Sequence, residues 1–162
     1  MLDHLVGLLV RALNSQVTGA KPLQVHIAID REHGFIRSFK VTHGARHDGA
    51  MLREVVTRNN TGSEVWADTA YRSKKNEAWL RRHGRTSQIH RRKPNGRTMP
   101  ERTSKANGKK SKVRALVEHV FAHEKHHIRT IGIKRAEAKI TLANLAYNIK
   151  RLLFHERRAA AG

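Results

Sequence analysis

One stretch of eight residues, Leu23 to Asp30, constrains the fold most strongly, because its side chains alternate between apolar and mixed character. The apolar side consists of Leu23, Val25, Ile27 and Ile29. This period of two is typical of a strand with one buried face. A turn of hairpin length follows at Arg31 to Gly34, and then a second β-prone run from Phe35 to Thr42. The pattern therefore predicts an antiparallel hairpin.

Helical and extended segments alternate after this hairpin. Asp48 to Thr57 has apolar residues at helical spacing behind a capping Asp48, which predicts a helix laid over the hairpin. Glu64 to Asp68 is a short apolar run that ends in a carboxylate, and the sequence predicts a strand there. A helix over Ser73 to Arg82 and a short strand over Ser87 to Ile89 are expected next.

The two ends of the chain and one basic segment complete the pattern. Asp3 to Asn14 has apolar residues at helical spacing, which predicts a short helix. Arg91 to Arg114 holds ten lysines and arginines and almost nothing apolar, so we expect residues 91–111 to form a mobile basic segment. Two helices are predicted to close the chain, at Lys112 to His127 and at Lys134 to Glu156.

Charge restricts the class of partner. The 162 residues include 33 Lys and Arg against 13 Asp and Glu, a formal net charge of +20 in a length that suits one domain. A surplus of this size favours a polyanion, and nucleic acid is favoured over an acidic membrane surface. The chain has no Cys, which excludes disulfides and thiolate chemistry. The apolar run Leu5 to Val10 is too short to span a bilayer, so a soluble protein is expected.

The predicted helix over residues 112–127 has one face that could carry chemistry. On a helical wheel Arg114, Glu118 and Lys125 share one side, next to an apolar stripe. A surface ion pair between Arg114 and Glu118 is the alternative interpretation of this spacing.

The order of elements, together with several separated motifs, resembles the ribonuclease-H-like, retroviral-integrase-like α/β core of DDE transposases. The insertion-sequence-five transposases of bacteria are the most similar, with the spacing Tyr-x2-Arg-x3-Glu-x6-Lys on their last catalytic helix; here Ser111 stands in the Tyr position. The matching stretches are Val25 to Asp30, His47-Asp48, Ala67-Asp68-Thr69-Ala70-Tyr71, Arg114 to Phe121 and Leu142-Ala-Asn-Leu145.

The resemblance implies a chemistry and a set of residues. Asp68 and Glu118 would be catalytic ligands of Mg²⁺ or Mn²⁺, with Asp68 Cγ and Glu118 Cδ within about 8 Å of each other. DNA, including element ends and target DNA, would be the partner; the family also allows a homo-oligomer and implies a cytoplasmic, nucleoid-associated protein. The basic residues expected to contact DNA are Arg114, Lys125, Arg91, Arg92, Lys93, Lys109, Lys110 and Lys112.

The family also requires a first Asp on a strand before the hairpin, and the sequence offers no good match. The four Asp residues are Asp3, Asp30, Asp48 and Asp68. We therefore expect the first catalytic strand to be missing. Residues 1–20 would be a non-matching segment, 21–156 a partial catalytic domain and 157–162 a tail. The whole is interpreted as an inactive, truncated remnant of a transposase.

Other interpretations remain open at this stage. His123-Glu124-Lys125-His126-His127 satisfies the zinc-hydrolase spacing His-Glu-x-x-His, although surface or DNA-facing histidines are favoured. Trp66 and Trp79 suit core packing better than base stacking, and Tyr71 suits packing better than a nucleophilic role. A non-catalytic DNA-binding protein and a small structural RNA-binding protein are the alternative functions.

Overall fold

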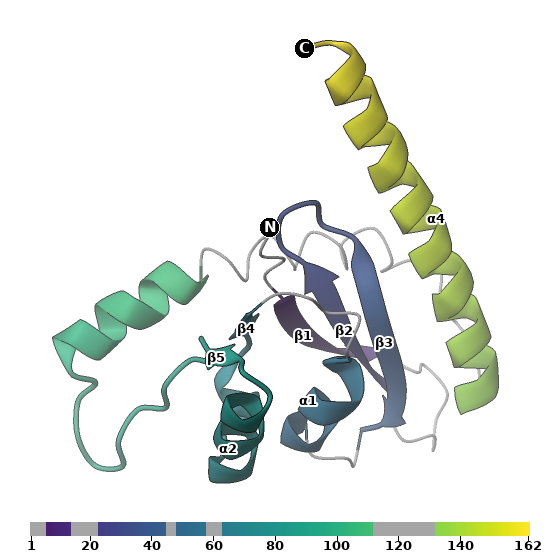
Figure 1. Ribbon diagram of the computed structural model, residues 1–162. Coiled ribbons are helices and arrows are strands. Elements are labelled where there is room, and N and C mark those ends of the chain that lie inside the picture. The colour runs from purple at the N-terminus through teal and green to yellow at the C-terminus, as the bar shows by residue number, and fades with distance from the viewer. Residues whose placement is uncertain (1–5, 14–22, 45–47, 58–62, 112–131) are drawn as a thin grey trace.

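The computed structural model describes residues 6–13, 23–44, 48–57, 63–111 and 132–162. They form a five-stranded sheet in the order β3-β2-β1-β4-β5. The strands are β1 (Val6–Leu13), β2 (Leu23–Asp30), β3 (Ile36–His43), β4 (Glu64–Trp66) and β5 (Thr86–Ser87). β1, β2 and β3 pair antiparallel, whereas β1, β4 and β5 pair parallel (Figure 1).

The predicted hairpin is confirmed as β2 and β3. Their register runs from Leu23 opposite His43 to Ala28 opposite Ser38, with an irregularity between Ala28 and Ile29. The turn is stabilised by Asp30, whose carboxylate accepts the amide of Glu32 at 2.9 Å. Gly34 follows with φ +76°, a left-handed conformation that a residue with a side chain rarely adopts.

Residues 6–13 form strand β1, so the prediction of a helix over Asp3 to Asn14 is wrong. β1 pairs with β2 over its full length, from Val6 opposite Asp30 to Leu13 opposite Leu23. A short apolar run fits a buried strand as well as a helix, and the neighbouring strands decide between them. β2 is buried along almost all of its length and is therefore an interior strand with partners on both sides. The expectation that the fold lacks its first strand is also wrong.

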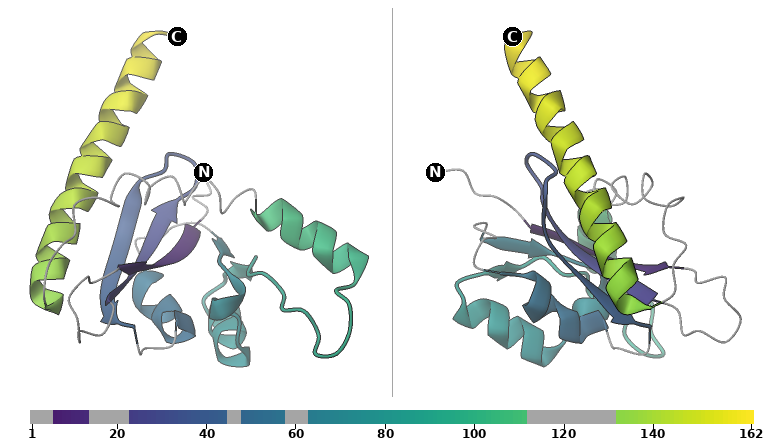
Figure 2. Two further views of the ribbon diagram at one scale, coloured as in Figure 1. Left: turned by 180° about the vertical axis from the view of Figure 1, so that it is seen from behind. Right: turned by 90° about the vertical axis from the view of Figure 1, so that its right-hand side faces the viewer.

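Helices cover both faces of the sheet (Figure 2). On one face lie α1 (Asp48–Val55), the short 3-10 helix η1 (Thr69–Tyr71) and α2 (Lys74–Arg82), whose N-cap Ser73 accepts the N–H of Asn76. On the other lies α4 (Ile133–Ala160), which confirms the predicted closing helix. The first face buries Ala28, Leu52, Val55, Val56, Val65, Ala67, Tyr71, Leu80 and Ile89. The second buries Leu23, Val25, Ile27, Ile29, Ile36, Val41, Ala136 and Ile140.

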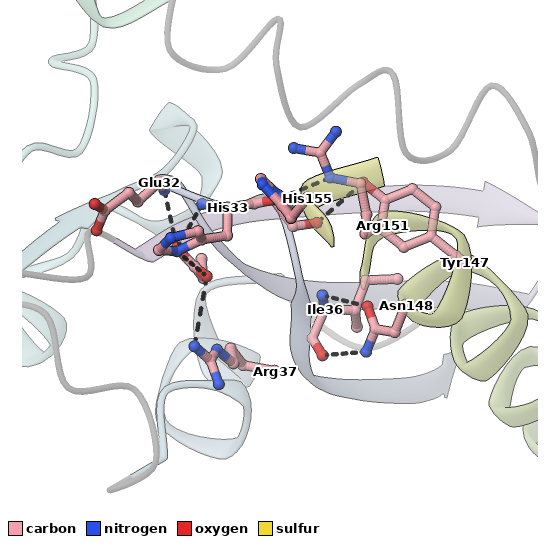
Figure 3. Close-up of polar contacts among 10 residues, drawn as sticks. Glu32, His33, Ile36, Arg37, Tyr147, Asn148, Arg151 and His155 are labelled. Atoms are coloured by element: carbon pink, nitrogen blue, oxygen red, sulfur yellow. Dashed lines mark hydrogen bonds and ion pairs between the residues drawn. The ribbon is translucent and has the colours of Figure 1, made fainter. Parts of the chain in front are cut away.

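Polar contacts fix α4 against the hairpin (Figure 3). The Asn148 amide accepts the backbone N–H of Ile36 at 2.9 Å and donates to the carbonyl of the same residue at 2.9 Å. One turn further along α4, Arg151 Nε donates to the carbonyl of His33 at 2.8 Å. These bonds satisfy backbone groups at the start of β3, and they set the direction in which the helix crosses the sheet.

Half of the basic segment that the sequence predicts to be mobile is helical. Residues 101–111 form a helix, whereas 91–100 contain no helix or strand. Lys, Arg and Glu are good helix formers, and Glu101 and Lys105 make an ion pair one turn apart at 2.6 Å. The Asn107 side chain accepts the Arg91 N–H at 3.1 Å and donates to the Arg91 carbonyl at 3.0 Å. These two bonds tie the helix to the chain that precedes it.

The predicted helix over Lys112 to His127 lies outside the described residues. No helix among those described is long and apolar enough to cross a membrane.

Candidate functional site

Asp68 lies two residues beyond the end of β4, at the carboxyl end of the parallel part of the sheet. Its side chain caps η1 by accepting the backbone N–H of Thr69, and the Thr69 hydroxyl lies 3.2 Å from the same Oδ1. A capping carboxylate is held in one orientation by these donors. The side chain nevertheless keeps 42% of its surface exposed. The carboxylate is therefore partly open to solvent at the carboxyl end of β4.

His90 is brought next to Asp68 by a continuation of the parallel sheet past β5. The N–H of Gln88 donates to the carbonyl of Val65 at 2.8 Å, and the N–H of His90 donates to that of Ala67 at 3.1 Å. His90 is only 8% exposed, and its Nδ1 lies 4.0 Å from Asp68 Oδ1. The sequence analysis missed this residue. The rule that the carboxyl ends of neighbouring parallel strands meet could have found it.

Two cations converge on the residue before His90. Arg72 Nη1 donates to the carbonyl of Ile89 at 2.9 Å, and Lys110 Nζ donates to the same oxygen at 3.4 Å. Burial lowers the pKa of Lys110, and the charges of Arg72 and Arg91 lower it further. Glu77 offsets part of this positive charge, because it pairs with Arg72 at 3.4 Å and raises the pKa of Lys110.

The predicted DNA-contacting residues fall into two groups. Arg91, Arg92, Lys93 and Lys109 are exposed, and Lys110 is half-buried beside the Asp68 turn. The other predicted residues are outside the part of the chain that the structure describes: Lys112, Arg114, Glu118 and Lys125, and the motif His123 to His127 with them. The expected approach of Asp68 to Glu118 stays a prediction.

β1, which pairs with β4 on the side of the hairpin, carries no carboxylate. β1 reads Val-Gly-Leu-Leu-Val-Arg-Ala-Leu. Gly7 lies level with Trp66 in the parallel register, and continuing this register by two residues sets Leu9 level with Asp68. Asp30, at the end of β2, is 1% exposed and is held by the turn amides and by Arg37 at 3.4 Å. Within the described residues, no group of three or more His, Asp or Glu is arranged to hold a metal ion.

A buried polar chain lies beneath the Asp68 turn. The hydroxyl of Tyr71 and His26 Nδ1 are 3.1 Å apart, and His26 Nε2 lies 3.0 Å from Thr42 Oγ1. Burial lowers the pKa of His26, although Asp48 opposes this effect, and burial raises the pKa of Tyr71. Both groups are therefore neutral at pH 7. Tyr71 is fully buried, as its predicted packing role requires, and it anchors η1 to the sheet.

The two tryptophans lie in different surroundings. Trp79 packs against the apolar cluster that contains Leu80, in agreement with a core role. Trp66 is half-buried and lies under the guanidinium of Arg31, whose central carbon is 5.0 Å from the ring centroid. Its indole N–H donates to Glu64 at 3.2 Å.

Comparisons with known proteins agree with this architecture. A family model described as a transposase DDE domain matches residues 15–149. The catalytic core domain of BIV integrase matches with a TM-score of 0.50 and 14% identity, covering 90% of this chain and 83% of that one. A simian T-cell lymphotropic virus intasome, in complex with PP2A regulatory subunit B56 gamma, matches with a TM-score of 0.47 and 15% identity, covering 88% and 47%. No curated protein matches. The fold is therefore ribonuclease-H-like, as the sequence predicts.

Proposed function

Because this chain belongs to the transposase DDE-domain family, we propose that it binds DNA as an insertion-sequence-five type protein but does not cut or join strands. The observation that carries this proposal is the composition of β1. The strand occupies its place next to β4 and supplies no carboxylate to face Asp68.

DNA binding is supported by the basic segment next to Asp68. Arg91, Arg92 and Lys93 project from a stretch without helix or strand, and Lys109 lies on the helix at residues 101–111. Exposed cations of this kind contact phosphates and release counterions, whatever the base sequence. In a bacterial cell such a chain would be cytoplasmic and associated with the nucleoid.

A divalent ion would have one ligand in the described part of the chain. Asp68 offers a partly exposed oxygen of the type that Mg²⁺ and Mn²⁺ prefer, and Glu118 would provide a second. In this family's chemistry a pair of such ions activates the attacking water or 3′-hydroxyl and stabilises the leaving oxygen. The N–H of Thr69 orients the Asp68 carboxylate, and the half-buried Lys110 would add positive charge for a phosphodiester bound nearby. Two carboxylates can hold one divalent ion weakly, but they do not suffice to hold two ions.

Loss of strand cleavage follows from the missing carboxylate. Two cations held close together repel each other, and a bridging carboxylate offsets this repulsion. Asp30 is a poor substitute, because its oxygens already accept two turn amides and face Arg37. Removing it from these contacts would break two hydrogen bonds of the turn and an ion pair.

The test combines binding with restored cleavage. Fluorescence anisotropy should detect binding to duplex DNA, while a donor plasmid with matched inverted repeats should stay uncut in Mn²⁺. We then expect Leu9→Asp to gain nicking activity that Glu118→Gln abolishes. Leu8→Asp is the matched control, since neighbouring strand residues point to opposite faces. Cleavage by the unaltered chain, lost in Asp68→Asn, would refute the proposal of inactivity, and failure to bind DNA would refute the proposal as a whole.

A further inference from the structure

α4 has an apolar face that the fold leaves open. The residues that contact the sheet include Ala136, Ile140 and Asn144, all buried. The largest exposed apolar side chains of the described chain also lie on α4, among them Leu142 at 67%, Leu145 at 56%, Ile149 at 50% and Leu152 at 49%. At about 100° per residue these four lie on the side of the helix facing away from the sheet. A continuous apolar strip of this kind marks an interaction surface.

The spacing of this strip matches a helix partner. Leu142, Leu145, Ile149 and Leu152 are separated by three, four and three residues, which is the a and d pattern of a coiled coil. We call these four residues the outer seam. The positions that flank the seam are uncharged, namely Thr141, Ala146, Asn148 and Leu153. A chain with net charge +20 thus presents one surface on which a second copy would meet no like charge.

We propose that the outer seam pairs two copies of this chain through antiparallel α4 helices. In this arrangement Leu142 meets Leu152 of the second copy, and Leu145 meets Ile149. The charges at the ends of the seam decide the direction. A parallel pair would set Arg135 against Arg135 and Glu156 against Glu156, whereas the antiparallel pair sets Glu156 beside Lys139 of the second copy.

The surroundings of α4 leave room for this pairing. α4 continues past its contact with the hairpin turn, where His155 lies 2.8 Å from the carbonyl of His33, and the helix at residues 101–111 lies at the far side of the sheet (Figures 1 and 2). DNA bound to the basic segment would not compete with the second copy. The seam with Leu153 exposes roughly 450 Å² of apolar surface per copy, a large patch for a monomer. Doubled, this area is in the range of small, transient interfaces, which suits a weak dimer of micromolar affinity.

Salt separates this proposal from DNA binding. The two copies repel each other through their net charge, so higher salt should strengthen the dimer, although it weakens phosphate contacts. The experiment is sedimentation equilibrium of the full chain in 0.15 M and 0.5 M NaCl. We expect a mass twice that of the monomer at tens of micromolar protein, with tighter association at the higher salt.

Two pairs of variants make the test specific. Ile149→Asp should weaken the dimer by at least about tenfold, since it buries a charge at the centre of the seam, whereas Phe154→Asp, an exposed apolar position off the seam, should not. The chain has no Cys, so single cysteines report distances. Ala146→Cys lies near its own counterpart across the antiparallel axis and should crosslink with a short bismaleimide; Ala138→Cys should not.

The outcomes that overturn the proposal are distinct. Crosslinking of Ala138→Cys would indicate a parallel pair, because that arrangement sets each residue level with its own counterpart. A monomer at every concentration would refute the pairing of two copies through the outer seam. A dimer that survives Ile149→Asp, with a helical circular dichroism spectrum unchanged, would place the interface elsewhere.

Discussion

Removing the hydroxyl of Tyr71 should destabilise the fold far more than its one hydrogen bond suggests. Tyr71→Phe keeps the ring that packs in the core and deletes only the group 3.1 Å from His26 Nδ1. His26 is fully buried, so water cannot replace the hydroxyl. A buried polar atom without a partner costs about 1–3 kcal/mol, and we expect a loss of about 2 kcal/mol in the free energy of unfolding.

A second background isolates this contact. In His26→Leu the Tyr71 hydroxyl itself has no partner on that side, so adding Tyr71→Phe should then cost less than about 0.5 kcal/mol or even stabilise the chain. Urea unfolding at pH 7.5, followed by far-UV circular dichroism, gives all four free energies of the cycle. Equal costs of Tyr71→Phe in both backgrounds would refute the argument, because the hydroxyl would then act independently of His26.

Three further predictions concern acid, the basic helix and DNA. Burial holds the pKa of His26 below its unfolded value of 6.5, so the unfolded chain takes up the proton first as the pH falls. The stability of the fold should therefore decrease as the pH drops through 6.5. Thermal melts at pH 7.5 and 5.5 should show this decrease, and it should be smaller in His26→Leu. Asn107→Ala removes both hydrogen bonds to Arg91 and should speed proteolysis after Lys or Arg in residues 91–111. Asn95→Ala is the control, and equal rates of proteolysis in the two variants would show that these bonds do not hold the segment. Log–log plots of DNA affinity against salt should have a slope of several units, reduced by about one in Arg92→Ala, and a flat plot would contradict phosphate binding.

The elements with a clear period could be predicted from the sequence alone. Leu23–Asp30 alternates because one face of β2 packs under α4, and its bounds are those expected. The start of a helix at Asp48 could be recognised, because a carboxylate is favourable in the first turn, and Ser73 caps α2 by accepting the N–H of Asn76. The position of Asp68 after a buried strand also follows from local pattern.

Other features depend on contacts that no local pattern contains. The apolar run at β1 becomes a strand because β2 and β4 both offer backbone groups to pair with, and β4 is distant from it in sequence. His90 reaches Asp68 only because residues 86–90 continue the ladder beside β4. The helix at residues 101–111 could not be predicted from apolar periodicity, because a highly charged segment without an apolar face has no amphipathic pattern.

The place of β1 in the sheet gives it an architectural role that is independent of any side-chain chemistry. It is the single strand that joins the antiparallel hairpin to the parallel pair β4 and β5, so its backbone bonds unite the two halves of the domain. Amides and carbonyls make that connection whatever residue occupies the strand. A carboxylate in such an interior strand would be an electrostatic burden, because its desolvation and its repulsion of Asp68 oppose folding. An apolar β1 avoids this cost, so the strand can hold the two halves of the sheet together through its backbone bonds alone.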